Sequence, residues 1–301
     1  MKEQDTTVMS RLSAELLTQF SDFVAEHMCL YFPPDRWPEL MRGARAAASA
    51  SGHASVEEYV RWLLSAQLTQ AQIEGLASHL TVGETYFFRG KSTFDVLAAE
   101  ILPELVRARR GSNQRLHIWS VGCCTGEEAY SLGILVSRAI PDLQDWHVTI
   151  LATDINRKFL HKAEAGVFGA WSFRDPPPML KELYFTPKAE GLYEIAPFVR
   201  KMVVFRPLNL AADVYPSLLN DTNAMDVILC RNVLMYFTPE QAGNVIRKLH
   251  HCLVDGGWLV VGPNETSSAR IRSRSPMQRA ARIVGSCARQ APFGLPVVPE
   301  V

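Results

Sequence analysis

The sequence lacks any net charge, any long apolar run and any recognisable leader. Its 301 residues carry 31 basic and 31 acidic side chains, whereas a dedicated nucleic-acid binder normally shows a basic excess. No apolar run approaches the ~18 residues of a membrane span. The first residues contain acids and no apolar core of a signal peptide. We therefore expect a cytoplasmic protein that binds no nucleic acid and does not insert into a membrane.

Cysteine is also sparse. Six cysteines in a chain of this length are too few for a disulfide scaffold. Cys123 and Cys124 are adjacent, and no Cys-x-x-Cys pair suggests a zinc or redox site. The eight histidines show no ligand spacing either, since His250 and His251 are neighbours on an expected helix and point in different directions. The sequence therefore predicts no metal site and a set of buried, reduced thiols.

The first part of the chain has the periodicity of helices. Apolar residues recur three and four positions apart. Ser55 and Thr69 are each followed three positions later by Glu or Gln, which is typical of a capping box at a helix start. Ser92 is expected to cap a further helix that ends near Gly111. These patterns predict an all-helical domain over residues 1–90.

From Leu116 onward, short apolar runs alternate with helical segments, which predicts βαβ units and a mainly parallel sheet. Residues 170–203 break the alternation with prolines and scattered aromatics, and the segment around Gly191 is typical of a hairpin. We predict an α/β domain over residues 91–290, with a small antiparallel subdomain inserted at about 170–203. Residues 291–301 are expected to form a tail.

A strand, a tight turn and a helix in the segment HIWSVGCCTGEEAYSLG give the clearest signal of a binding site. Gly122 and Gly126 permit the turn and let a ligand approach the backbone, as at the switch point of a doubly wound sheet. The full Gly-x-Gly-x-x-Gly of dinucleotide sites is missing. Glu127 and Glu128 open the helix, where they would repel a pyrophosphate but could receive an ammonium group. This favours S-adenosylmethionine over NAD, although acids at this position also stabilise a helix without any ligand.

A single carboxylate follows the second expected strand. Asp154 lies 28 residues after Gly126, and an acid at the end of this strand is well placed to accept both ribose hydroxyls. An isolated Asp after a strand is more often a turn or cap residue. Its combination with the glycine turn favours the binding role.

The segments TVGETYFFR, IWSVGCCTGEEAYSLGILV, ILATDINRKFLHKA, RPLNL and MDVILCRNVLMYF resemble successive motifs of the CheR-type chemotaxis receptor methyltransferases. They follow the family's order across residues 81–262, and the helical N-terminal part matches as well. The resemblance implies a Rossmann-like S-adenosylmethionine-dependent methyltransferase sheet, an N-terminal helical bundle and an inserted β-subdomain. It also implies methyl transfer to glutamate side chains of a chemoreceptor, whose cytoplasmic helices would be the partner.

Carried over position by position, the resemblance also implies the site residues. Thr85, Arg89 and Glu127 would contact the methionine end of the cofactor, Asp154 the ribose, and Asn209, Leu210, Arg231 and Asn232 the adenosine, beside the Gly122 turn. The residues nearest the reactive methyl would be Arg89 and Tyr236. The alternative interpretation of Arg89 is a surface arginine, and that of Tyr236 is an aromatic residue of the core. The receptor would dock on Arg36, Arg42 and Arg45, which are also what a solvated helix face shows.

The sequence departs from the family pattern at some positions. Gly83 stands where the family often has Asn, so one cofactor contact is expected to be missing. The hairpin around Gly191 resembles a subdomain that in some members grips a receptor-terminal peptide. Residues 281–289 resemble the last strand of the methyltransferase sheet.

Two other functions stay open. The first is a non-catalytic adaptor of the same fold, which the presence of Arg89, Glu127, Asp154 and Asn232 disfavours. The second is a methyltransferase acting on another substrate, such as RNA or a small acid, and the neutral charge disfavours RNA. That neutrality is a sum of unlike parts, because residues 270–301 hold six arginines and one glutamate. Any attraction to an acidic receptor must therefore come from a local patch.

Overall fold

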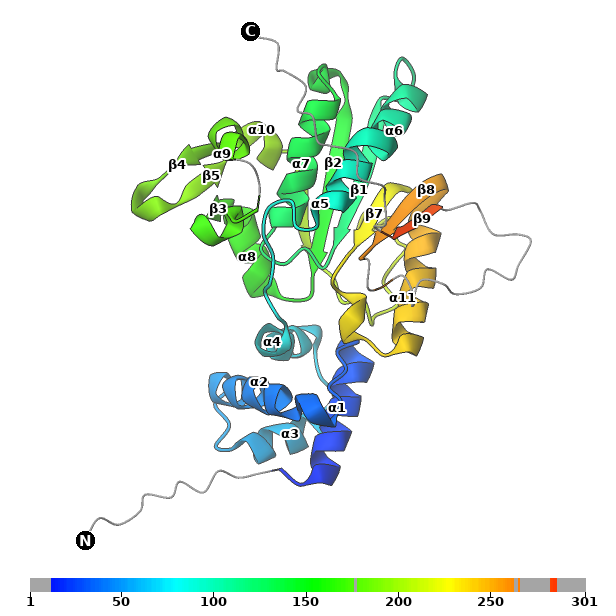
Figure 1. Cartoon of the computed structure of the whole chain (residues 1–301). Helices are drawn as coiled ribbons and strands as arrows, with labels where there is room; N and C mark the ends of the chain where they lie inside the picture. The colour runs from blue at the N-terminus through cyan, green and yellow to red at the C-terminus, as the bar shows by residue number, and fades with distance from the viewer. Residues whose placement is uncertain (1–11, 176–177, 263–264, 266–281, 286–301) are drawn as a thin grey trace.

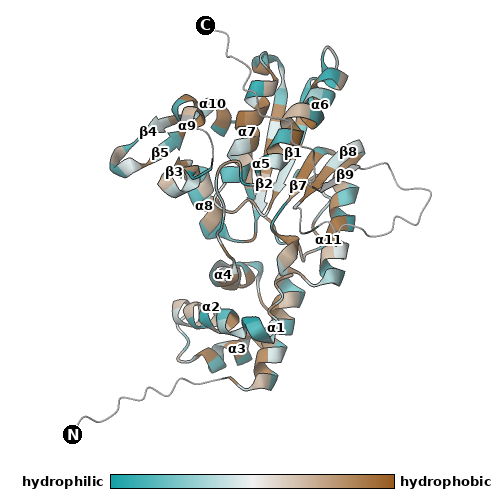
Figure 2. Cartoon of the chain, in the orientation of Figure 1, coloured by the Kyte–Doolittle hydropathy of each residue, from teal (hydrophilic) through white to brown (hydrophobic). Residues whose placement is uncertain are grey.

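The computed structural model describes residues 12–175, 178–262, 265 and 282–285, and shows a helical domain below an α/β domain (Figure 1). The helices combine hydrophilic and hydrophobic residues, as α11 (Pro239–Cys252) shows (Figure 2), and its buried residues include Val245, Ile246 and Leu249. The helical domain consists of α1 (Ala14–Met28), η1 (Pro34–Arg36), α2 (Trp37–Ala50), α3 (Val56–Ser65) and α4 (Gln70–Leu80).

Local capping signals start these helices. Thr69 accepts the backbone N–H of Gln72, and the Gln72 side chain accepts the N–H of Thr69, so the predicted capping box is confirmed. Ser55 caps α3 as predicted, but the Glu58 carboxylate accepts the N–H of Ala54 rather than that of Ser55. The side chains of Ser55 and Thr69 thus satisfy N–H groups that have no partner within the helix, whereas α2 begins without a side-chain cap.

Several small residues of α2 face inward. Ala44, Ala47 and Ala48 are buried. A Cβ on Gly43 would lie 2.6 Å from the carbonyl oxygen of His79, so only glycine lets α2 approach α4 this closely. The small residues on this side of α2 are therefore explained by packing, while Ala46 and Ala50 are exposed.

The central sheet is parallel, with strand order β6-β2-β1-β7-β8-β9. The chain runs outward from β1 on one side and resumes at β7 on the other, so the switch point lies between β1 and β7. These strands are β1 (Arg115–Val121), β2 (His147–Asp154), β6 (Val203–Pro207), β7 (Met225–Cys230), β8 (Leu253–Val261) and β9 (Arg282–Gly285). The α/β fold and its parallel sheet are confirmed.

Helices cover both faces of the sheet. Ile118 of β1 belongs to the apolar cluster that includes α7 (Glu127–Ala139) and α8 (Arg157–Ala165). Its neighbour Trp119 belongs to the cluster formed with α11 (Pro239–Cys252). Alternate strand residues therefore feed two separate cores, which fixes the register of the sheet.

The helix after Arg89 differs from its prediction. It begins at Lys91, with Gly90 (φ +74°) as its N-cap, so the prediction of a Ser92 cap was wrong. It runs as α5 (Lys91–Val96), the π-turn η2 (Leu97–Ile101) and α6 (Leu102–Arg109). Pro103 at the start of α6 has no N–H for the carbonyl one turn earlier, and the wider turn accommodates its ring.

A small antiparallel sheet forms the predicted inserted subdomain. Its order is β3-β5-β4, and Gly191 (φ +71°) lies at the turn between β4 and β5 as predicted. Phe87, from the segment before α5, packs against Phe168, Phe173 and Phe185 of the subdomain. Its elements are β3 (Val167–Phe168), η4 (Ala170–Phe173), α9 (Pro178–Tyr184), β4 (Phe185–Pro187), η5 (Ala189–Gly191), β5 (Tyr193–Ile195) and α10 (Pro197–Arg200).

Cysteines within the described residues are free and buried, and burial raises the pKa of every one of these thiols, that of Cys29 to about 11. Cys287, most of the segment 281–289 and the expected tail lie outside the described residues. The domain boundaries at residues 90 and 290 stay predictions. No helix in the described part of the chain is long and apolar enough to cross a membrane.

Candidate functional site

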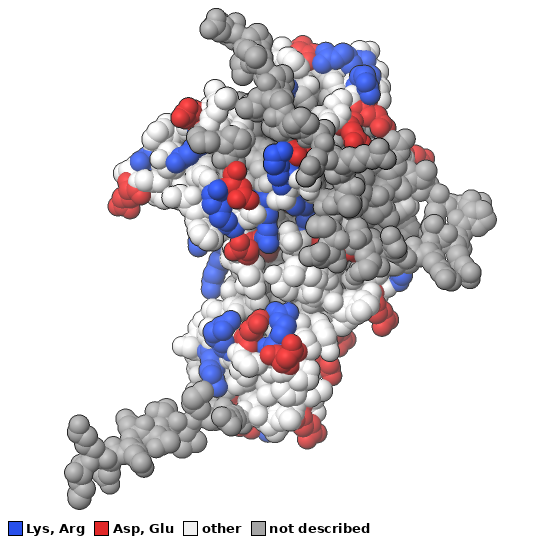
Figure 3. All heavy atoms as spheres, viewed as in Figure 1, with Lys and Arg blue, Asp and Glu red and all other residues white. Residues whose placement is uncertain are grey.

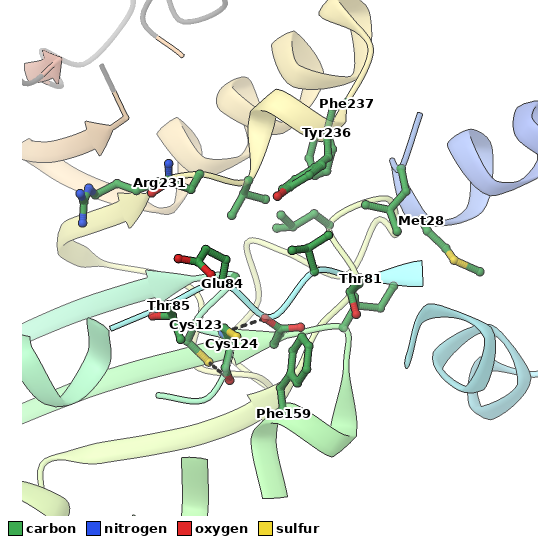
Figure 4. Close-up of a pocket in the computed structure, with 18 of the residues that line it drawn as sticks. Met28, Thr81, Glu84, Thr85, Cys123, Cys124, Phe159, Arg231, Tyr236 and Phe237 are labelled. Carbon is green, nitrogen blue, oxygen red and sulfur yellow. Dashed lines mark hydrogen bonds between the residues drawn. The ribbon is translucent and has the colours of Figure 1, made fainter. Parts of the chain in front are cut away.

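A large cavity opens at the carboxyl ends of the central strands, between the sheet and the helical domain (Figure 4). Together with its open mouth the space measures about 1150 Å³, and it lies at the place expected of a cofactor site in an open α/β sheet. Its wall is built from residues in the segments 28–36, 80–94, 122–128, 153–159, 208–210 and 231–237.

The turn after β1 forms the cavity floor. Gly122 (φ +68°) and Gly126 (φ +95°) both adopt left-handed conformations. A Cβ on Gly122 would lie 2.4 Å from a methyl carbon of Val233, and one on Gly126 would lie 2.8 Å from the Cβ of Ala163. The two glycines are therefore required by the packing of the protein itself as well as by the turn.

Asp154 ends β2 beside this turn. Its carboxylate is only 8% exposed and accepts the backbone N–H groups of Cys124 and Asn156, both at 2.9 Å. Burial raises the pKa of this carboxyl group, while the two backbone N–H groups act in the opposite direction. A carboxylate has about four acceptor positions, so it retains the capacity to accept hydroxyl groups of a ligand in the cavity.

The two acids that open α7 have different positions. Glu127 is buried and is not part of the cavity wall. It accepts the hydroxyls of Thr125 at 2.7 Å and Ser172 at 2.8 Å, and so ties the glycine turn to the subdomain. Neighbouring helix residues point about 100° apart, so Glu128 lines the cavity instead.

Glu128 is paired with a buried arginine. Its carboxylate accepts the hydroxyl of Ser120 at 2.8 Å and lies 3.0 Å from a guanidinium nitrogen of Arg231. Burial raises the pKa of Glu128, while Arg231 acts to lower it. Arg231 also donates to the carbonyl of Arg89 at 2.6 Å, and its guanidinium points away from the centre of the cavity (Figure 4). Its charged group therefore supports the wall that its backbone lines.

Arg89 and Tyr236 both line the cavity, from opposite segments. Arg89 donates to the carbonyl of Glu84, and the segment before it is anchored by Phe88, whose N–H binds the hydroxyl of Ser131 at 2.9 Å. Tyr236 ends η6 (Leu234–Tyr236), and its hydroxyl points into the cavity (Figure 4).

The three arginines predicted to dock a receptor are separated by the fold. Arg36 belongs to the cavity wall, with its guanidinium 4.9 Å from the ring centre of Phe32 and 5.7 Å from that of Tyr236. Arg42 and Arg45 lie exposed on α2, away from the cavity. Acidic side chains lie among the basic ones on the visible face of the helical domain (Figure 3).

The residues predicted to bind the adenosine lie in the cavity wall, but their side chains differ in how far protein contacts already occupy them. Asn209 donates to the carbonyl of His27 at 2.7 Å and accepts the N–H of Ala211 at 3.0 Å, so its amide joins the two domains. Leu210 and Asn232 complete this side. Thr85, the other predicted contact, also lines the cavity.

Sequence patterns missed part of the wall. Cys124 and Phe159 line the cavity; both lie within motifs recognised in the sequence, but neither was assigned a contact there. A Cβ on Gly83 would lie 2.9 Å from the ring of Phe159, so this ring fills the space of a side chain at position 83. The departure from Asn is thereby matched by a large residue on α8. Apolar residues of α1 and its following loop, such as Met28, were also missed because their approach is purely tertiary.

Comparison with known proteins gives consistent matches. A family model described as "CheR methyltransferase, SAM binding domain" matches residues 83–281. The chain is 34% identical over 235 residues to chemotaxis protein methyltransferase 2 of Vibrio cholerae, covering 77% of this chain and 78% of that one. It is 36% identical over 200 residues to chemotaxis protein methyltransferase 1 of Pseudomonas aeruginosa, covering 64% and 69%. A solved structure of the plantazolicin methyltransferase BpumL in complex with SAH aligns with 86% of this chain and 65% of its own chain, at 11% sequence identity and a TM-score of 0.34.

Proposed function

Because the chain belongs to the CheR methyltransferase family, we propose that it transfers a methyl group from S-adenosylmethionine to glutamate side chains of a chemoreceptor, forming γ-methyl esters. Its partners are then the cytoplasmic helices of that receptor, and it acts in the cytoplasm. The observation that carries the proposal is the buried Asp154 carboxylate, which retains acceptor capacity in a cavity at the switch point of the sheet.

The residues of the cavity fit the cofactor. Asp154 would accept the two ribose hydroxyls, and Leu210 with Asn232 would flank the adenine. The guanidinium of Arg89 would bind the carboxylate at the methionine end, near Thr85.

The ammonium group of the cofactor would meet Glu128 rather than Glu127, since Glu128 lines the cavity. Glu127 would act through the turn, because its carboxylate already accepts two hydroxyls. The cavity wall therefore has an acid for the ammonium group of the cofactor (Glu128), an acid for its ribose hydroxyls (Asp154) and an arginine for its carboxylate (Arg89).

The reaction needs alignment more than proton transfer. A glutamate with pKa about 4.3 is ionised at neutral pH, so it needs no general base. The bound cofactor supplies a methyl group on a positively charged sulfur, which leaves without an acid. Arg89 and Tyr236 would orient the substrate carboxylate, and the surrounding wall would exclude water.

The guanidinium of Arg36 in the cavity wall supports an acidic substrate. Arg36 is held over two aromatic rings and pairs with Glu39 at 2.8 Å, so its guanidinium is fixed beside Tyr236. We infer that Arg36 draws the glutamate side chain toward the cavity, while Arg42 and Arg45 contact the receptor farther out.

The β-subdomain offers a second area for the same partner. It exposes several large apolar side chains, and exposed apolar surface of this kind marks an interaction site where the side chains form one patch. These are Trp171, Met179, Leu183, Leu192 and Phe198.

The test is incubation of the full chain with labelled S-adenosylmethionine and cytoplasmic receptor fragments. We expect label on receptor glutamates that is released as a volatile product by base, and none on a fragment whose acceptor glutamates are replaced by alanine. Calorimetry that detects no cofactor binding at high micromolar concentration would favour the adaptor instead. Label found only on RNA would assign the protein another substrate.

A further inference from the structure

Glu265 is a buried carboxylate that the cofactor site does not yet account for. It is 3% exposed and makes no ion pair within the described residues. One oxygen accepts the backbone N–H groups of Asn232 and Gly262, both at 2.9 Å. The other accepts those of Val233 at 2.8 Å and Met235 at 3.3 Å. A carboxylate therefore gathers four backbone donors around one point.

Three of these donors lie between the end of β7 and the first turn of η6, and the fourth follows β8, so none of them has a partner within a strand or helix. Asn232 has a left-handed conformation (φ +57°), which turns successive N–H groups toward the same side. Gly262 makes room for the acceptor, since a Cβ on it would lie 2.4 Å from a Glu265 oxygen. The chain thus provides both the donors and the space for this carboxylate.

The loop that Glu265 holds is also part of the cavity wall. Asn232, Val233 and Tyr236 line the cavity. The Val233 methyl group is pressed against Gly122 of the floor, and the carbonyl of Tyr236 accepts the N–H of Tyr31 at 2.7 Å. A shift of this loop would therefore move the floor contact, the tyrosine and the junction with the helical domain together.

We propose that Glu265 is a positioning residue, which holds loop 232–236 in its binding conformation before the cofactor arrives. It touches neither the cofactor nor the substrate and acts through Asn232, Val233 and Tyr236. The inference rests on the proposed cofactor site. A loop ordered in advance loses less entropy on binding, so loss of the carboxylate weakens cofactor affinity more than it affects the remaining fold.

Asp226 provides a matched control at the opposite end of β7. It is also a buried carboxylate, it accepts the N–H of His117 at 2.8 Å and a bond from Arg109, and it is not part of the cavity wall. Glu265→Gln and Asp226→Asn each keep the shape and remove the charge. If Glu265 had only a structural role, the two variants would lose the same thermal stability, and Glu265→Gln would not selectively weaken cofactor binding.

The first measurement is calorimetric titration of the full-length wild type and both variants with S-adenosylmethionine. We expect the Kd to rise at least tenfold in Glu265→Gln and to stay within twofold in Asp226→Asn. An unchanged Kd in Glu265→Gln, or an equal rise in both variants, would overturn the positioning role. Wild-type protein that fails to bind the cofactor would instead overturn the proposed function.

The second measurement is amide hydrogen exchange in the cofactor-free protein. In Glu265→Gln, one of the two acceptor oxygens is replaced by an NH2 group. Either Asn232 and Gly262 or Val233 and Met235 then lose their acceptor, and the amides of that pair should exchange at least tenfold faster, while those of β7 keep their wild-type rates. Asp226→Asn should leave the loop amides protected. Equal protection of the loop in Glu265→Gln and wild type would contradict the proposal independently of any cofactor.

Discussion

Burial disfavours the ionised form of the Asp154 carboxylate, whereas the ribose hydroxyls that we propose it binds would favour that form. Asp154→Asn keeps the shape but removes an ionised acceptor from the ribose hydroxyls. Since hydrogen bonds to charged groups contribute about 1.5–3 kcal/mol, we expect the Kd for S-adenosylmethionine to rise roughly 10- to 100-fold. Calorimetric titration measures this change, and an unchanged affinity would remove the ribose assignment.

The same residue predicts a pH dependence of binding. Hydroxyl donors bind the ionised carboxylate, and burial raises the pKa of both Asp154 and Glu128 from their ordinary values. As pH falls through these raised values, protonation competes with the cofactor, so its Kd increases. Asp154→Asn should show a shallower dependence, because only Glu128 then titrates. A wild-type Kd that stays constant down to about pH 4 would contradict this mechanism.

The place of a single residue was predictable where it follows from local position. Asp154 is such a case, since the end of a strand beside a glycine turn fixes its place. Which of Glu127 and Glu128 faces the cavity depends on the rotation of α7 against the sheet, which two adjacent acids do not reveal. Asn209 also differs, because its amide binds the carbonyl of His27 across the domain junction.

The helix from Lys91 to Arg109 lies between two left-handed glycines that differ only in their surroundings. A Cβ on Gly90 (φ +74°) would lie 2.2 Å from a guanidinium nitrogen of Arg231, while one on Gly111 (φ +73°) would meet nothing within 4 Å. Alanine at either position strains the backbone by about 1–2 kcal/mol. We expect Gly90→Ala to lower the free energy of unfolding by at least about 1 kcal/mol more, in chemical denaturation.

The control for this prediction is therefore Gly111→Ala at the far end of the helix. Gly90→Ala should also weaken cofactor binding, because it displaces Arg231 from Glu128 in the cavity wall. Equal losses in the free energy of unfolding would contradict the prediction, because they would show that Arg231 can move aside without loss of stability.

Helices and strands were predictable where short-range signals decide them. The caps at Thr69 and Thr238 need only residues three positions away, and both form capping boxes. The start at Lys91 was mispredicted because the guanidinium of Arg231 leaves no room for a side chain at position 90, and Arg231 is distant in the sequence. The π-turn before Pro103 likewise depends on how a long helix accommodates a proline.

The two domains share the cavity and are joined around it. Arg157 of α8 binds the buried carboxylate of Glu74 in α4, and neither residue lines the cavity. Arg157→Ala leaves Glu74 without its cationic partner, which costs about 1–3 kcal/mol for a buried group. We expect a lower free energy of unfolding and a Kd for the cofactor that rises severalfold, because the helical wall of the cavity is then less well held.

Arg110→Ala is the matched control, since Arg110 pairs with Asp142 on the exposed side of the α/β domain. Thermal unfolding and calorimetric titration of both variants distinguish a junction effect from the loss of any ion pair. The prediction fails if the cofactor binds Arg157→Ala as tightly as wild type.

Alternating strands and helices predicted the parallel sheet of the whole molecule, because this pattern permits few connections. The position of the helical domain over the carboxyl ends of the strands was not predictable in the same way. It depends on contacts such as Gln241 with the carbonyl of Ala25, at 2.5 Å and far apart in the chain. The cavity wall supplied by α1 was therefore missed.

The contact between Gly122 and Val233 has a consequence for the evolution of this chain. The valine methyl group occupies the space of a side chain at position 122, and the left-handed turn requires glycine there as well. A lineage that gave up methyl transfer would therefore still have to keep glycine at position 122 for as long as it kept this turn and valine at position 233. Position 233 is freer to drift, because a smaller residue there needs no exchange at position 122.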